Sequence, residues 1–167
     1  MTGLDPEKER IIEIAVIVTD GNLHVLAEGP DLVIRQPLRF LKAMDDWNQK
    51  QHKKSGLLEE VKNSKVTFRQ AERKILDFIK PYCVPGKAVL CGSSVHHDRR
   101  FMIKYMPRLD KFLHYRHIDV STVKALIQRW YPRECKKIPK KSDTHRALPD
   151  IRESIEELKF HRRTFFK

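Results

Sequence analysis

The sequence predicts a single α/β domain, residues 1–167, with a mixed β-sheet flanked by helices. Candidate strands come first, and helical segments then alternate with short apolar runs, an order typical of α/β folds. The chain has 167 residues, 40% of them hydrophobic, which is enough for one domain with a real core.

In the first half, strands are expected near residues 11–18, 24–29 and 32–35. The sequence DGN separates the first two and indicates a hairpin. The segment PLRFLKAMDDWNQKQHKKSG is expected to form one helix ending near Gly56. A further helix is expected in TFRQAERKILDFIKPYC, because Thr67 and Gln70 have capping-box spacing ahead of an apolar face.

In the second half, AVLC is expected to be a short strand in which Cys91 is a small buried residue. Helical patterns follow in DRRFMIKYM, after which Pro107 restarts a helix, and in STVKALIQRW, with Ser121 or Thr122 as the N-cap. The segment YRHIDV between them is expected to be a strand.

The last helix is expected in HRALPDIRESIEELKFHRR, lying across one face of the sheet. Pro149 is suited to the first helical position and Asp150 to the first turn. Ile151, Ile155 and Leu158 form an apolar stripe at helical spacing. On this segment alone, an ordinary helix start explains the presence of His145 and Asp150. Catalysis is the alternative explanation.

Composition restricts the classes of partner. The net charge of +12, from 34 basic and 22 acidic residues, favours a polyanion such as nucleic acid, the alternative being a basic surface without such a partner. No apolar run approaches the roughly 20 residues of a membrane span, and MTGLDPEKER resembles neither a signal nor a transit peptide. Three cysteines without a CxxC motif indicate neither a disulfide framework nor a structural zinc site, which fits a reducing compartment.

Dispersed aspartates and one histidine suggest phosphodiester chemistry. Asp98 follows the AVLC strand, where functional groups often lie, although it also suits a helix N-terminus. Two-metal hydrolysis needs carboxylates as ligands and a base to deprotonate water. Asp98 and Asp150 are candidate ligands and His145 is the candidate base, but two carboxylates are few for that task.

Other residues suggest contacts with RNA. Trp47 and His52 lie among lysines, an arrangement that can stack a base and hold a phosphate; a core tryptophan on an amphipathic helix is the alternative. The lysines of CKKIPKK, residues 135–141, precede His145 and are candidates for phosphate contacts. Adjacent His96 and His97 are expected to be surface residues and a poor joint metal site.

The chain resembles the oligoribonucleases, the small-fragment nucleases among the DEDDh 3′-to-5′ exonucleases. The resemblance covers essentially all 167 residues. The matching stretches are MTGLDPEKERIIEIA, NLHVLAEGP, MDDWN, KSGL, DRRFMIKYMP, HYRHIDVSTVKAL, RWYP and HRALPDIRES. The sequences SVHHD and PKK before HRAL are more similar to the eukaryotic, mitochondrial branch.

The resemblance implies an RNase H-like fold and the hydrolysis of short single-stranded RNA, about two to five nucleotides long, to 5′-mononucleotides. It implies Mg²⁺ or Mn²⁺ as cofactor, a homodimer, and a mitochondrial or cytoplasmic location without membrane partners. Asp98 and Asp150 match metal ligands, and His145 matches the general base. The residues that match substrate contacts are Leu4, the wedge between bases, Trp47, His52, Ser94 and Ser121, with Tyr115 and Arg116 reaching the partner's site.

Departures from the family pattern are also expected to matter. In the family, a central strand ending in Asp-Leu-Glu precedes MTGLD and supplies two further metal ligands. The sequence starts at Met1 of that motif, so we expect an N-terminally truncated domain without its first, central strand and an unstable isolated chain. Asp5 and Glu7 are not replacements, because they lie beyond the wedge residue. Ser93 stands where the family has Asn, and Pro149 where it has Asp.

Two function classes therefore remain open. The first is an oligoribonuclease-type exoribonuclease whose activity is impaired in this chain. The second is a catalytically inactive relative that binds short RNA or dimerises. A DNA-specific exonuclease is a weaker third interpretation, because the resemblance is to the short-RNA branch throughout.

Overall fold

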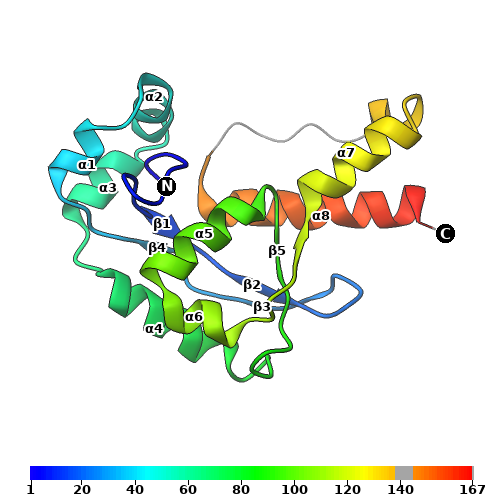
Figure 1. Cartoon of the computed structure of the whole chain (residues 1–167), viewed down its shortest axis with the longest axis horizontal. Coiled ribbons are helices and arrows are strands. Elements are labelled where there is room, and N and C mark those ends of the chain that lie inside the picture. Colours follow the sequence, from blue (N-terminus) through cyan, green and yellow to red (C-terminus); the bar gives the residue numbers. More distant parts are fainter. Residues whose placement is uncertain (138–144, 167) are drawn as a thin grey trace.

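A computed structural model describes residues 1–137 and 145–166, and Figure 1 shows the arrangement of its elements. The segment 138–144, which holds two lysines of CKKIPKK, lies outside the described residues. The elements are, in order, β1 (Glu13–Ile14), β2 (Ile17–Thr19), β3 (Val25–Glu28), β4 (Leu32–Val33), α1 (Leu38–Lys42), α2 (Asp46–Lys54), α3 (Leu57–Asn63), α4 (Phe68–Ile79), β5 (Leu90–Gly92), α5 (Val95–Tyr105), α6 (Pro107–Phe112), β6 (His117–Asp119), α7 (Val120–Trp130), the 3₁₀ helix η1 (Glu134–Lys137) and α8 (Ala147–Phe165).

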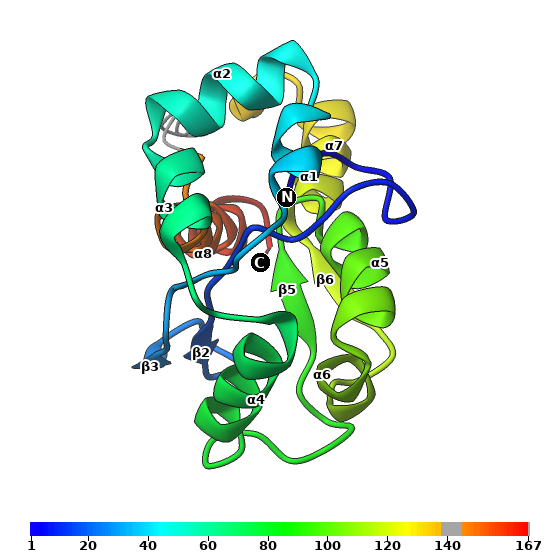
Figure 2. The same ribbon diagram turned by 90° about the vertical axis from the view of Figure 1, so that its left-hand side faces the viewer.

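The strands form three separate pairs within the described residues. β1 pairs with β4 and β2 with β3, both antiparallel, whereas β5 pairs with β6 in parallel. Figure 2 shows the β2–β3 hairpin and the β5–β6 pair on opposite sides of the interior. The α/β class and the mixed strand directions are confirmed. Within the described residues these pairs remain three two-stranded sheets.

The first expected strand, 11–18, is interrupted rather than continuous. Its first part pairs with β4, and its second part pairs with β3 through the predicted DGN hairpin. The register of the β2–β3 pair shifts between Val18 and Thr19. A bulge of this kind bends a strand and increases its twist, which shortens the regular ladder.

The single helix expected over residues 37–56 is wrong, because the structure contains two. α1 ends before Ala43, and Asp45 then caps α2 by accepting a hydrogen bond from the Asn48 N–H at 2.8 Å. The helix α3, which the sequence analysis missed, follows directly after Gly56. That glycine has a φ of 76°, a left-handed conformation that ends one helix and starts the next at little cost.

The helix α4 begins as predicted. The Thr67 hydroxyl accepts from the Gln70 N–H, and the Gln70 side chain accepts from the Thr67 N–H, which completes the capping box. Its apolar face joins the main core, together with β2, β4, α5 and α6. The most buried members of that core are Ile34, Ala71, Phe101, Met106 and Ile75.

The prediction that Cys91 is buried is wrong. Cys91 is exposed. Val89 is exposed too, and so is Ile118, the cross-strand partner of Cys91, which is 46% exposed. Alternate residues of a strand point to one face, so these side chains belong to a single face of the β5–β6 pair. Among the described residues, no element packs over this apolar face. The apolar sequence AVLC therefore did not lead to burial of Cys91.

The last helix, α8, contacts β1 and β5, but its buried face differs from the expected one. Ile151, Ile155 and Leu158 are only half-buried, whereas the most deeply buried residues are polar: Ser154, Glu157 and His161. The Glu157 carboxylate forms an ion pair with Lys124 of α7 at 3.0 Å, which compensates for the burial of its charge.

The start of α8 also differs from expectation. The helix begins at Ala147, which places Pro149 third rather than first. This position is tolerated because N–H groups in the first turn have no helical partner.

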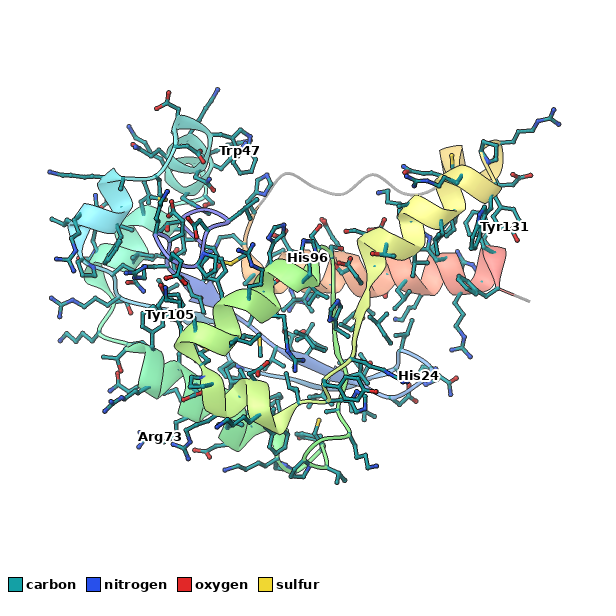
Figure 3. The ribbon with its side chains drawn as sticks, in the orientation of Figure 1. His24, Trp47, Arg73, His96, Tyr105 and Tyr131 are labelled. Atoms are coloured by element: carbon teal, nitrogen blue, oxygen red, sulfur yellow. The ribbon has the colours of Figure 1, made fainter. Side chains whose placement is uncertain are left out.

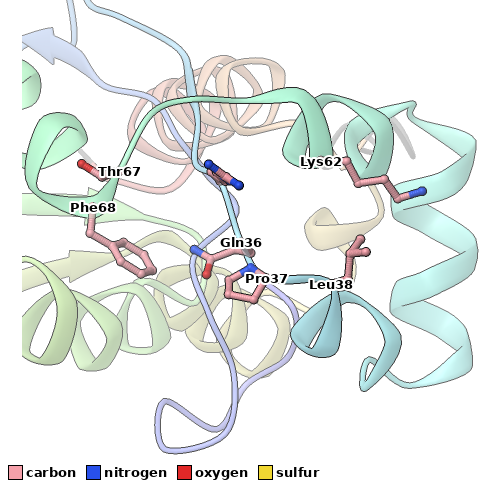
Figure 4. A pocket seen from close by; sticks show the side chains of 7 residues that line it. Gln36, Pro37, Leu38, Lys62, Thr67 and Phe68 are labelled. Carbon is pink, nitrogen blue, oxygen red and sulfur yellow. The ribbon is translucent and has the colours of Figure 1, made fainter.

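A groove of about 730 Å³ lies between the end of β4 and the start of α4, as Figure 4 shows. It is lined by Arg35, Gln36, Pro37, Leu38, Lys62, Thr67 and Phe68. None of these residues was singled out for catalysis or RNA binding. Among the described helices, none combines the length and apolarity needed to cross a membrane.

Candidate functional site

The candidate site forms around Met1, between α2 and α5, near the start of α8 (Figure 1). His52 of α2 is buried, and its Nε2 lies 3.0 Å from the Met1 carbonyl oxygen. The α-amino group of Met1 interacts electrostatically with Asp98 of α5 and with Glu13 of β1. Segments far apart in the sequence therefore converge at the first residue.

Trp47 and His145 are in direct contact. Their ring centroids are 5.2 Å apart at an interplanar angle of 77°, an edge-to-face arrangement. Trp47 is 57% exposed, so the interpretation of this residue as a core tryptophan is wrong. Figure 3 shows Trp47 projecting from α2 towards the start of α8. The predicted base and the predicted base-stacking residue therefore share one surface.

His145 and the start of α8 are held by an anchor at Arg146. The guanidinium binds Glu13 at 2.7 Å and makes a bidentate contact with Glu60 of α3 at 2.7 and 2.9 Å. Donating hydrogen bonds to the Glu60 carboxylate raises the pKa of Arg146 above its ordinary value. His145 itself has a φ of 48°, an uncommon conformation for a residue with a side chain.

Glu13 is a contributor that the sequence analysis missed. Its carboxylate, 4% exposed, accepts from Arg146 and from the Ala147 N–H at 2.8 Å. Burial raises its pKa, and these hydrogen bonds oppose that effect. An acidic residue inside the apolar run RIIEIAV was the signal that could have identified it, because charged groups in a core need partners.

Asp98 lies in the first turn of α5, as predicted. The residue keeps an exposed surface, but loss of water around its carboxyl group raises its pKa above the ordinary value. The positive α-amino group of Met1 and His96 oppose that effect. A carboxylate in such surroundings is well placed to gain from a nearby cation.

Asp150 occupies the first turn of α8. Its carbonyl oxygen accepts from the Ser154 hydroxyl at 2.8 Å, and that hydroxyl lies 3.0 Å from the Ser93 hydroxyl. Ser93, which stands where the family has Asn, thus connects the end of β5 to α8. The elements that carry Asp98 and Asp150 are joined by this pair of contacts.

The described residues do not supply a complete metal centre. Within residues 1–137 and 145–166, no group of three or more His, Cys, Asp or Glu side chains is arranged to hold an ion. The role of Asp98 and Asp150 as metal ligands stays a prediction. His96 and His97 lie with ring centroids 4.0 Å apart, and His96 is exposed as expected, whereas His97 is half-buried.

Ser94 and Ser121 meet at the ends of β5 and β6. Their hydroxyl oxygens are 3.3 Å apart, and the Ser121 hydroxyl also accepts from the Ser94 N–H at 3.0 Å. The N-cap of α7 is Asp119, not Ser121 or Thr122 as predicted. The strand ends at Asp119, one residue earlier than the predicted end at Val120, which moves the cap towards the N-terminus.

The remaining substrate-contact predictions fall on exposed residues. Leu4 is 59% exposed, and its carbonyl lies 3.5 Å from the Arg100 guanidinium. Tyr115 is 71% exposed, with the Arg116 guanidinium 5.3 Å from its ring. Exposure leaves all three available for contacts outside this chain.

The two acids that follow Leu4 lie on the surface. Glu7 binds Lys104 at 2.7 Å, and Asp5 lies 3.8 Å from Lys8.

We expect the stability contributed by His52 to depend on pH. Burial, reinforced by the Met1 α-amino group, lowers its pKa to about 4. An unfolded histidine titrates near 6.5, so this contribution is fully present above that pH and is lost as the pH falls towards 4. The expected loss is at most about 3 kcal/mol, since one pKa unit is about 1.4 kcal/mol.

Urea unfolding of the wild type and of His52→Gln at pH 7.5 and 4.5 measures this effect. The wild type should lose more stability than the variant between the two pH values. A matched variant, His24→Gln, changes an exposed histidine and should follow the wild type. Parallel losses in the wild type and His52→Gln would contradict the expectation.

Comparison of the sequence with known proteins assigns the chain to a family. Residues 1–158 match the sequence profile of the exonuclease family RNase_T. The whole chain is 54% identical to human mitochondrial oligoribonuclease, covering 70% of that protein. It is 56% identical to an oligoribonuclease of Haemophilus influenzae and 54% identical to one of Bordetella pertussis, covering 91% and 92% of those proteins. The chain therefore belongs to the RNase_T family of exonucleases and, within it, to the oligoribonucleases.

Proposed function

We propose that this chain is a 3′-to-5′ exoribonuclease that degrades short oligoribonucleotides to 5′-mononucleotides. The observation that carries the proposal is identity of 54–56% to oligoribonucleases along the entire chain. The contact between Trp47 and His145 supports it, because it joins a base-stacking surface to a candidate base.

In the proposed reaction His145 accepts a proton from water. The water oxygen attacks the phosphorus of the last phosphodiester, the bond from phosphorus to the 3′-oxygen breaks, and the departing 3′-oxygen takes up a proton from solvent water. The products are a 5′-mononucleotide and an RNA with a free 3′-hydroxyl. Trp47, His52 and Leu4 hold the bases, while Ser94 and Ser121 contact polar groups of the substrate.

The proposed cofactor is Mg²⁺ or Mn²⁺, with Asp98 and Asp150 as donors. When bound, such ions stabilise negative charge on the attacking and leaving oxygens. Because the described residues offer no group of three donors, we propose that turnover by this chain is impaired. The alternative function, a catalytically inactive relative that binds short RNA or dimerises, is favoured by the same observation.

The proposed assembly is a homodimer that acts inside the cell, in mitochondria or cytoplasm. The exposure of Tyr115 and Arg116 supports contacts to a partner's site. The net charge of +12 supports a nucleic-acid partner rather than a neutral one.

The function is tested with 5′-labelled RNA and DNA dinucleotides and Mn²⁺ at micromolar protein, following mononucleotide release. Release from RNA but not from DNA supports the proposed activity. Binding of the RNA without release supports the inactive relative. Failure to bind either dinucleotide contradicts both.

Replacing Trp47 with alanine is expected to weaken binding of an RNA dinucleotide by about 5- to 150-fold, the range of one lost base stack. Trp47→Phe should retain most of the affinity, because phenylalanine keeps an aromatic face. Trp130→Ala is the matched control, since Trp130 is 66% exposed on α7 and outside the candidate site. Equal affinities of Trp47→Ala and the wild type would show that this ring does not hold a base.

A further inference from the structure

One carboxylate connects the ends of β5 and β6 beside the candidate site. Asp119 Oδ1 accepts from the Ser121 N–H at 2.9 Å and from the Ser94 N–H at 3.0 Å. Its Oδ2 lies 3.3 Å from His96 Nδ1. The Asp119 side chain is only 9% exposed, although its partners Ser94 and His96 lie at the surface.

The contact to Ser94 exceeds what a helix cap requires. An N-cap residue normally satisfies an N–H of its own helix, and Asp119 does so at Ser121 of α7. Its second bond reaches across the sheet to the residue that starts α5. The carboxylate therefore joins two helices that begin side by side at the ends of parallel strands.

Ser94 adopts a conformation that needs support. Its φ is 55°, in the left-handed region, which costs a residue with a side chain roughly 1 kcal/mol or more. Its N–H donates to Asp119 Oδ1 and also to the Ser121 hydroxyl, each at 3.0 Å, and these contacts hold the conformation. The Ser94 hydroxyl then lies 3.3 Å from that of Ser121, and Asp98 on α5 follows Ser94 by four residues.

We infer that Asp119 is a positioning residue for RNA binding, which holds the left-handed backbone of Ser94 and thereby aligns the Ser94 and Ser121 hydroxyls for the substrate. The inference rests on the proposed function, because it assigns these hydroxyls to RNA. Asp119 does not touch the substrate. Its effect reaches the ligand through the backbone N–H groups of the two serines.

The test compares Asp119→Ala, Asp119→Asn and the wild type. Titration calorimetry with an RNA dinucleotide carrying a phosphorothioate linkage, in EDTA, measures binding without turnover. Loss of the charged acceptor in Asp119→Ala should weaken binding by about 10- to 100-fold. Asp119→Asn keeps an oxygen acceptor for both N–H groups, so binding should return to within about threefold of the wild type.

Hydrogen exchange at the Ser94 amide supplies a readout independent of RNA. It should be faster in Asp119→Ala and near the wild-type rate in Asp119→Asn. Thr67→Ala is the control, because it removes the cap of α4 and lowers stability without altering the affinity for RNA.

The outcomes separate the inference from the proposed function. Unchanged Ser94 exchange in Asp119→Ala, an affinity within about twofold of the wild type, or equal weakening by Thr67→Ala would overturn the inference. If the wild type binds no RNA, the proposed function fails, and the exchange at Ser94 alone decides whether Asp119 holds this backbone.

Discussion

Fusing a family-type strand that ends in Asp-Leu-Glu ahead of Met1 is expected to raise mononucleotide release from an RNA dinucleotide by at least about 100-fold. The family resemblance places two metal ligands in that strand, and the described residues contain no group of three donors. Loss of indirect support at a metal site already costs about 10- to 100-fold, so restoring direct ligands should have a larger effect.

The matched control is the same fusion with Asn-Leu-Gln in place of Asp-Leu-Glu. It supplies the strand and its backbone pairing but not the carboxylates. A large gain only with the acidic strand supports the role of the two acids. Equal activity of the unmodified chain and the acidic fusion would contradict the proposed impairment, and an inactive acidic fusion would implicate Ser93 and Pro149.

Replacing His145 with alanine is expected to lower that release by about 100- to 10,000-fold, the contribution typical of a general base. The contact with Trp47 places the imidazole on the surface proposed to hold the bases. The substitution should reduce kcat while the affinity for RNA changes little, because the proposed role lies in proton transfer. Single-turnover measurements with the acidic fusion separate the two effects.

His24→Ala is the matched control for this substitution, because His24 is exposed and pairs with Asp20 beside the hairpin turn. It should retain wild-type turnover. Activity of His145→Ala comparable to that of His24→Ala would show that a group other than His145 accepts the proton from water.

Local chemistry predicted several elements well. The capping box at Thr67 and Gln70, the DGN hairpin and the first-turn position of Asp98 depend on residues near one another in sequence. Such interactions keep their meaning whatever the surrounding fold. Trp47 contacts His145, and His52 and Asp98 interact with Met1, while the roles that the resemblance implies for these residues stay predictions.

The errors fall where tertiary contacts override local pattern. Cys91 has an apolar neighbourhood in sequence, but the face of its strand is uncovered within the described part of the chain. The buried stripe of α8 can be polar because Glu157 forms an ion pair with Lys124 of α7. Glu13 and Asp119 were missed for the same reason, since their partners lie far away in the sequence.

The anchor at Arg146 has a consequence for how this part of the sequence can vary. His145 is adjacent to Arg146, whose guanidinium donates hydrogen bonds to Glu13 of β1 and Glu60 of α3. The position of His145 is therefore determined by those two elements. Substitutions outside this anchor should then displace His145 less. Changes at Glu13 or Glu60, although neither residue would meet RNA, should be tolerated poorly. Sequence drift among related chains is expected to follow this division.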